Sequence, residues 1–172
     1  MIESEKAIII KFLKKACALV PENRREWMTV NNDMAYITDS HILLKHYVGD
    51  IFEKSQPIRA MKSDIKSFLK GQPFNASIVH HLTITVLENV TEVPKGYVSA
   101  PFEESLISFD KADAGKRPVM NLQKVNKAMA LFNFTVTVSH APEDFQNKPV
   151  VFKGKSKFGH DLTVVLMPER MY

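Results

Sequence analysis

The chain has 172 residues, of which 45% are hydrophobic and 24% are charged, and its formal net charge is +4. This length suits one domain, and the apolar content is sufficient for a core, which excludes a disordered chain. The apolar residues 7–10 are followed by Lys11, Lys14 and Lys15, so this run predicts neither a signal peptide nor a membrane span. The single cysteine, Cys17, excludes an internal disulfide and a cysteine-based zinc site, and we expect a protein of the reducing cytoplasm.

Three segments carry apolar residues at helical spacing and are predicted to be amphipathic helices. They are residues 5–19, 62–69 and 121–132. Pro21 ends the first helix and Gly71 follows the second. Asn121 is a suitable N-cap for the third helix, because its side-chain oxygen can accept a hydrogen bond from a free backbone N–H of the first turn.

Several other segments have strand character. They are residues 27–30, 34–38, 42–48, 82–86, 134–138, 149–152 and 162–167. The first two are separated by Asn31-Asn32-Asp33, and Asn and Asp tolerate the left-handed conformation that a tight hairpin turn needs. The last two are expected to form a hairpin around the polar loop 153–161. Residues 89–118 contain three prolines and two glycines and are predicted to be a long connection.

The order of these elements predicts the fold class. Helices alternate with groups of hairpin-linked strands, which favours an α+β fold with antiparallel sheets over a doubly wound parallel sheet. The recurring unit of one helix followed by strands indicates an internal repeat. We expect an N-terminal lobe over residues 1–95, a connecting segment over 96–118 and a C-terminal lobe over 119–172, which together form one compact domain.

Positive charge is concentrated on the predicted helices. Residues 6–15, 59–70 and 116–127 carry net charges of +4, +3 and +4, so the remainder of the chain carries −7. Lysine is a good helix former, so a charged helical face can be an ordinary solvated surface. Here, however, lysine repeats at i,i+4, at Lys11 and Lys15 and again at Lys62, Lys66 and Lys70. This repetition favours a face that follows the phosphates of a polyanion. The candidate DNA-binding residues are Lys11, Lys14, Lys15, Lys62, Lys66, Lys70, Lys124 and Lys127.

The residues that accompany the lysines indicate whether single-stranded or duplex nucleic acid would bind. Phe12 and Phe68 belong to the predicted apolar faces, so no aromatic residue lies among the lysines on the outer faces. This disfavours stacking on single-stranded bases and suits a duplex backbone. A fourth basic run, Lys148, Lys153, Lys155 and Lys157, lies around the last predicted loop. We interpret this run as a solvated loop.

Two short stretches resemble motifs of a known family. Residues 37–44, Ile-Thr-Asp-Ser-His-Ile-Leu-Leu, resemble the "ATDGHRLA" segment of the bacterial sliding clamp, the beta subunit of DNA polymerase III. The chain end, residues 164–172, resembles the terminal "YVVMPMRL" of the same family. Residues 121–132 and 148–152 resemble the helix and strand that precede that terminus, and residues 101–107 resemble its "FPDYRRVIP" segment. The resemblance covers about half of the chain and implies a DNA-clamp-like fold, with amphipathic helices packed on antiparallel sheets.

In sliding clamps these two stretches line a pocket that binds the peptide tails of polymerases and clamp loaders. Carried over by position, the pocket residues implied by the resemblance are Thr38, His41, Leu43, Val165, Met167, Pro168, Arg170 and Met171. Methionine and leucine give such a pocket an adaptable apolar floor. This chain departs from the family where Ile42 replaces an arginine, where Glu169 replaces an apolar methionine, and where Tyr172 extends the end by one residue.

The resemblance implies a binding function without catalysis. We expect a sliding-clamp-like processivity module that contacts duplex DNA and docks a DNA polymerase or clamp-loader peptide, with no cofactor and no membrane partner. The chain is about half as long as a family clamp, so ring closure requires a homo-oligomer of more copies. The alternative is a clamp-fold adaptor that binds a polymerase or a host clamp without encircling DNA.

A metal site was the remaining alternative from the residues themselves. Asp39 and His41 share one face of a predicted strand, and His46, His80 and His81 could add ligands. No HExxH-type signature accompanies them, and Asp39-Ser40-His41 is part of the clamp-like motif. Adjacent residues on a strand cannot converge as a hydrolase triad, so we expect no catalytic and no metal site.

Overall fold

The fold is built on one sheet. The computed structural model describes residues 3–19, 27–51, 57–70, 77–109 and 117–169. The helical segments are α1 (Glu3–Cys17), α2 (Lys62–Leu69), α3 (His81–Val90), the 3-10 turn η1 (Glu104–Leu106) and α4 (Leu122–Met129). The strands are β1 (Trp27–Asn31), β2 (Met34–Thr38), β3 (Ile42–Tyr47), β4 (Ile58–Met61), β5 (Ser77–Ile78), β6 (Val98–Pro101), β7 (Phe132–His140), β8 (Val150–Ser156) and β9 (Asp161–Leu166).

All nine of these strands belong to a single sheet in the order β5-β4-β1-β2-β3-β9-β8-β7-β6. Every neighbouring pair in the sheet is antiparallel. The predicted α+β class with antiparallel strands is therefore confirmed. The N-terminal and C-terminal halves of the chain meet in the middle of the sheet, where β3 pairs with β9 and residue Leu44 lies opposite Val164.

The same unit occurs twice along the sheet. In each half a helix is followed by three strands that pair in sequence: α1-β1-β2-β3 and α4-β7-β8-β9. The third strands of the two units, β3 and β9, pair antiparallel, so the units are related by an approximate two-fold axis through the centre of the sheet. A fourth strand flanks each unit, β4 beside β1 and β6 beside β7. The internal repeat expected from the order of elements is thus visible in the topology.

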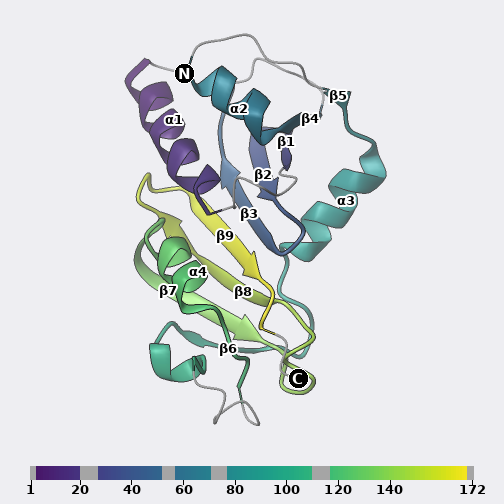
Figure 1. The fold of residues 1–172 in the computed structure, drawn as a ribbon, viewed down its shortest axis with the longest axis vertical. Helices are drawn as coiled ribbons and strands as arrows, with labels where there is room; N and C mark the ends of the chain where they lie inside the picture. Colours follow the sequence, from purple (N-terminus) through teal and green to yellow (C-terminus); the bar gives the residue numbers. More distant parts are fainter. Residues whose placement is uncertain (1–2, 20–26, 52–56, 71–76, 110–116, 170–172) are drawn as a thin grey trace.

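Helices α1, α2 and α4 cover one face of this sheet, which we call the helix face (Figure 1). Their inward side chains, such as Leu13, Ile65 and Val125, join one buried cluster with the sheet. The sheet contributes to it from paired positions. They include Met28, Ile37, Leu44, Val164, Phe152 and Val138. Because side chains alternate along a strand, the intervening residues point to the opposite face.

The opposite face is covered in part by α3. Tyr36, Leu43, Val151 and Val165 form a smaller buried cluster there, and Leu87 of α3 packs against it. We call this side the α3 face. Lysines 45 and 153 also point to this side, because Lys45 and Lys153 both pair with Thr163 in the ladder beside the cluster.

Local signals explain the elements that the sequence located well. α2 has the predicted bounds, and α1 begins and ends two residues earlier than predicted. Asn121 caps α4 as expected: the backbone N–H of Lys124 donates a hydrogen bond to its side-chain oxygen at 3.1 Å. In the β1–β2 hairpin, Asn32 and Asp33 have φ values of 45° and 71°, which is the left-handed conformation predicted for this turn.

The strand predicted at residues 82–86 is wrong, because these residues lie in helix α3. The alternation of Leu82, Ile84 and Val86 arises because α3 has two apolar sides. Ile84 is 4% exposed, whereas Leu82 and Val86, one turn apart, are 81% and 59% exposed. His80 at the N-cap makes no side-chain capping bond, so no local signal marked the start of the helix.

The last hairpin has a shorter loop than predicted. The polar run 153–161 was expected to be a loop, but β8 extends to Ser156 and β9 begins at Asp161. The polar residues at both ends of this run therefore lie on strands, and the β8–β9 ladder continues to the pair Lys155 and Asp161. The predicted connection 89–118 likewise contains the end of α3, strand β6 and η1.

A bulge in β7 shapes the sheet beside this hairpin. The register shifts between Asn133 and Val136, and Phe134 within the bulge is 93% exposed with φ of 58°. Gly154 of β8 lies against the bulge, where a Cβ atom on Gly154 would come within 2.8 Å of the Thr135 carbonyl oxygen. The bulge therefore requires glycine at this position.

Candidate functional site

The lysines of α1 lie on its outer side because its apolar stripe is turned inward. Ile9, Phe12, Leu13, Ala16 and Cys17 are buried under the helix. Lys11, Lys14 and Lys15 occupy the positions between them and are exposed. The two acidic residues of the helix, Glu3 and Glu5, are confined to its first turn. Beyond its first turn, every charged side chain of α1 is therefore a lysine.

α2 and α4 repeat this arrangement on the same face of the sheet. Lys66 and Lys70 are exposed at α2, where Asp64 lies in the first turn. Lys127 is exposed and Lys124 half-buried on α4, whose segment Leu122–Met129 contains no acid. Lys62 also lies in α2, but its side chain is outside the described part. We call the described set the lysine surface: Lys11, Lys14, Lys15, Lys66, Lys70, Lys124 and Lys127.

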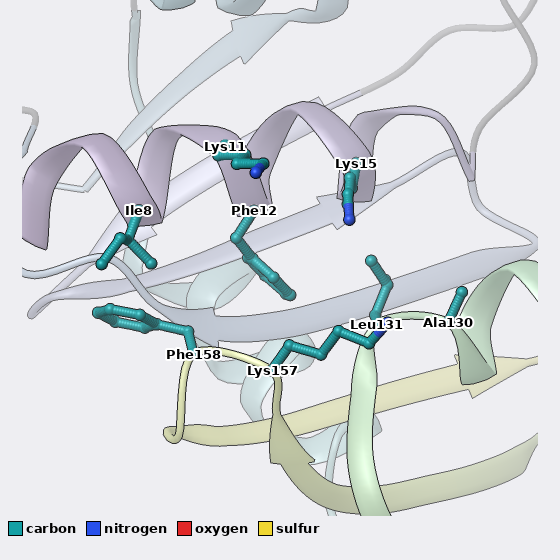
Figure 2. Close-up of a pocket in the computed structure, with 8 residues that line it drawn as sticks. All are labelled: Ile8, Lys11, Phe12, Lys15, Ala130, Leu131, Lys157 and Phe158. Atoms are coloured by element: carbon teal, nitrogen blue, oxygen red, sulfur yellow. The ribbon is translucent and has the colours of Figure 1, made fainter.

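A cleft of about 180 Å³ opens in the lysine surface, between α1 and the turn that joins β8 to β9. Figure 2 shows Lys11 and Lys15 along the α1 side of this cleft and Lys157 on the side of the turn. The rest of the lining is apolar: Ile8, Phe12, Ala130, Leu131 and Phe158. We call this site the α1–turn cleft.

Buried polar contacts hold the turn beside the cleft. The backbone N–H of Phe158 donates to the Ser156 hydroxyl at 3.2 Å, and this hydroxyl lies 2.7 Å from Nε2 of His46. Nδ1 of His46 lies 2.6 Å from the Tyr47 carbonyl oxygen, to which it can only donate, so Nε2 accepts from Ser156. The His46 ring also packs on Phe12, with ring centroids 4.1 Å apart.

His46 is fully buried, and this burial determines its charge. Removal from water disfavours the imidazolium and lowers the pKa of His46 from 6.5 to about 4, although the Tyr47 carbonyl opposes the shift. At neutral pH the imidazole is therefore uncharged and can accept the Ser156 hydrogen bond. The neutral ring is a structural support of the α1–turn cleft.

The two clamp-like stretches lie side by side. Leu43 pairs with Val165 in the β3–β9 ladder, and the Met167 N–H donates to the His41 carbonyl oxygen at 3.1 Å. The loop before β3 is held by Asp39, whose carboxylate accepts from the backbone N–H groups of His41 and Ile42, each at 2.8 Å. These contacts place the first predicted pocket wall directly beside the second.

The predicted pocket residues differ in accessibility. His41 is exposed, Met167 is 37% exposed and Thr38 is half-buried. Pro168 is buried, and Leu43 and Val165 are buried in the cluster that α3 covers. Arg170 and Met171 lie outside the described residues. A ligand at this site would therefore meet His41 and Met167 first.

Glu169, which departs from the family pattern, has a structural partner at α4. Its backbone N–H donates to the Val119 carbonyl oxygen at 2.7 Å, and its carboxylate accepts from the amide of Asn121 at 3.2 Å. A carboxylate near the N-terminus of a helix is favoured by the helix dipole. Glu169 thus binds the segment that follows β9 to the cap of α4.

The histidines considered as metal ligands lie in different places. His46 is buried on the helix face, His41 is exposed in the β2–β3 loop, and His80 and His81 begin α3. Asp39 binds backbone N–H groups instead. Within the described ranges, no group of three or more His, Cys, Asp or Glu side chains is placed to hold a metal ion.

A second hollow, of about 610 Å³, lies on the α3 face. Lys45, Lys153 and Lys155 line it together with Glu92 and Asp161. Lys155 and Asp161 form an ion pair at 2.5 Å, which lowers the pKa of the carboxyl. The second hollow therefore carries both positive and negative side chains, whereas the lysine surface is positive throughout.

The α1–turn cleft has no contiguous signature in the sequence pattern. Its walls come from residues 8–15, 130–131 and 157–158, which are far apart in the chain. The available signal was Phe158, a large aromatic residue beside Lys157 in a run that was interpreted as a solvated loop. An aromatic residue in a polar turn generally has a packing partner.

Comparison with known proteins assigns no family. The chain matches no protein-family model, and no curated protein is significantly similar to it. None of the helices in the described segments is long and apolar enough to span a membrane.

Proposed function

We propose that this chain is a sliding-clamp-like module that contacts duplex DNA through its lysine surface and docks a partner peptide beside β3 and β9. One observation carries the DNA part of the proposal. Three helices from distant parts of the chain cover the same face of one sheet, and each presents at least one exposed lysine. The repeated helix-and-three-strand unit supports the clamp-like part.

The lysine surface suits a duplex backbone on electrostatic grounds. Lys11 and Lys15 lie one turn apart on α1, and such like-charged pairs destabilise an isolated helix by a few tenths of a kcal/mol. A phosphate backbone placed opposite would remove this repulsion and release counterions. Helices that contact phosphates without reading bases give binding that is independent of sequence, as a sliding module requires.

Partner docking is proposed for the site formed by the two clamp-like stretches. His41 and Met167 are its accessible members, and the backbone bond between them fixes their spacing. Methionine gives an adaptable apolar contact, and an imidazole can bind a polar group of an extended peptide. Docking of a polymerase or clamp-loader peptide here would leave the lysine surface free for DNA.

The DNA contact is tested with two double variants of equal charge change. Lys66→Glu with Lys127→Glu alters the lysine surface, and Lys95→Glu with Lys153→Glu alters exposed lysines away from α1, α2 and α4. Fluorescence anisotropy with a labelled duplex is expected to show at least about tenfold weaker binding for the first variant. The second variant is expected to bind nearly as the unaltered chain does. Equal losses in both would contradict a specific DNA face.

An adaptor that keeps the clamp-like fold without encircling DNA is the second candidate, and α3 favours it. Leu82, Val86 and Val90 follow one another at one-turn spacing on α3 and expose 81%, 59% and 40% of their surface. Apolar patches of this kind mark protein–protein contacts. Two measurements separate the candidates: light scattering after gel filtration gives the oligomeric state, and co-elution with circular DNA shows whether the protein stays on it. An oligomer that co-elutes with circular DNA supports the clamp, and a monomer that binds no duplex supports the adaptor.

A further inference from the structure

The α1–turn cleft combines two kinds of surface that duplex DNA would not use together. Its rim carries Lys11, Lys15 and Lys157, and none of its eight lining residues is acidic. Its floor is formed by apolar side chains, among them Phe12 and Leu131. A phosphate backbone would occupy the rim and leave the floor empty, because it offers no apolar group. The floor therefore indicates a ligand other than the duplex.

The lining also discriminates between classes of amphipathic anion. A nucleobase is recognised by hydrogen bonds to its edge as well as by stacking. Apart from the three lysines, every lining side chain is apolar, so no lining side chain offers an acceptor or a neutral donor to a base edge. An aliphatic or aromatic side chain flanked by carboxylates needs only what this cleft supplies, apolar contact and positive charge.

The size of the cleft sets the size of the buried group. Its volume of about 180 Å³ is close to that of an engineered protein cavity, about 150 Å³, that holds one benzene molecule. One phenylalanine or leucine side chain would fill it. The flanking carboxylates would then lie at the rim, near the ammonium groups.

We propose that the α1–turn cleft binds an acidic peptide segment of a partner protein, anchored by one large apolar side chain. Because Lys11 and Lys15 belong to the lysine surface, the bound peptide excludes duplex DNA from this part of it. The competition rests on the proposed function, whereas the docking itself does not. The cleft is thus a point at which a partner releases or blocks DNA.

The cleft is formed before any ligand arrives. Phe158 is held by its backbone bond to Ser156, and Phe12 is packed on the His46 ring at 4.1 Å between centroids. Contacts of this kind leave few side chains to be ordered on binding, which reduces the entropic cost of association. Only the exposed lysines at the rim need to be fixed by the ligand.

The probe is a fluorescein-labelled peptide of alternating aspartate and glutamate with one central phenylalanine. A control peptide has alanine in place of the phenylalanine and the same charge. Fluorescence polarisation with the full chain is expected to show clearly tighter binding of the phenylalanine peptide. Unlabelled duplex is expected to displace it, since the two ligands share lysines.

Two matched variants separate the cleft from the general charge of the surface. Ile8 lines the cleft and is 50% exposed, and Leu122 on α4 is 46% exposed and does not line it. Ile8→Ser is expected to lower the affinity for the phenylalanine peptide about fivefold and to leave the affinity for duplex unchanged. Leu122→Ser is expected to change neither. Both positions are solvent-accessible, so both variants should fold.

Equal binding of the two peptides, or an Ile8→Ser variant that binds like the unaltered chain, would overturn the proposal. A third result would also overturn it: neither peptide binds, whereas a single-stranded oligothymidylate binds and loses affinity in the Ile8→Ser variant. The cleft would then accept a base. Peptide binding that depends on Ile8 in a chain that binds no duplex would confirm the docking. In that case only the proposed DNA function would fail.

Discussion

At the scale of single residues, the His46 imidazole is held by contacts on both nitrogens and on its ring. It is fully buried, its two nitrogens are bonded to Tyr47 and Ser156, and its ring packs on Phe12. Protonation would convert Nε2 from an acceptor to a donor and would charge a group inside the core. His46 therefore connects the stability of the sheet to the shape of the α1–turn cleft.

Acid is expected to destabilise the protein through this residue. Burial lowers the pKa of His46 to about 4 in the folded protein, against 6.5 for an ordinary histidine. Between these values the unfolded chain binds more protons than the folded one, so the His46 contribution is complete above pH 6.5 and is lost as the pH falls. The loss of the His46 contribution alone should make the free energy of unfolding roughly 3 kcal/mol smaller at pH 4 than at pH 7.

Urea unfolding of two variants at both pH values checks this prediction. His46→Gln removes the titrating group and should reduce the difference between pH 7 and pH 4. His140→Gln is the matched control, because Nδ1 of His140 also bonds the next carbonyl oxygen, at 2.9 Å, but this ring is only half-buried. The same pH dependence in His46→Gln as in the control would show that acid acts elsewhere.

At the scale of elements, the β7 bulge and Gly154 depend on each other. A Cβ at residue 154 would lie 2.8 Å from the Thr135 carbonyl oxygen and 3.1 Å from Cδ1 of Phe132. The first neighbour is backbone, so the bulge itself would have to shift. Gly154→Ala is expected to lower the free energy of unfolding by about 1–3 kcal/mol.

The matched change is Lys153→Ala, one residue earlier on the same strand, where the side chain is exposed. Equilibrium urea unfolding should show a lower midpoint for Gly154→Ala and little change for Lys153→Ala, with the same urea dependence in both. Equal midpoints for the two variants would mean that the bulge adapts to a side chain without cost.

The elements differ in how well the sequence predicted them, and the reason is the range of the interactions involved. α2, the cap of α4 at Asn121 and the turn at Asn32 and Asp33 depend on residues a few positions apart, so local patterns located them. α3 was missed because its exposed side carries Leu82 and Val86, which an amphipathic pattern does not allow for. Only the tertiary structure shows which apolar side of α3 is covered.

In the candidate site, too, local patterns predicted some features, and long-range interactions determine the others. Helical spacing alone indicated that the lysines of α1, α2 and α4 point to solvent. That the three helices share one face of the sheet follows from the pairing of β3 with β9, which joins residues about 120 positions apart. The α1–turn cleft depends on the same long-range pairing and on the turn at Phe158, so no local pattern could predict it.

At the scale of the whole molecule, the approximate two-fold axis explains how the chain presents one basic surface. Each repeated unit places its own helix, α1 or α4, on the same side of the sheet, because the units are joined edge to edge through β3 and β9. Helix α2, which follows β4, adds further lysines there. The opposite side carries α3 and the mixed charges of the second hollow.

The central claim, that the lysine surface contacts duplex phosphates, is tested most directly by the salt dependence of duplex binding. The logarithm of the binding constant should fall linearly with the logarithm of salt concentration, with a slope of about −0.9 for each neutralised phosphate. Replacing Lys14, Lys66 and Lys127 together by alanine should make this slope shallower by about three units. An unchanged slope in the triple variant, or duplex binding that does not respond to salt, would contradict the account.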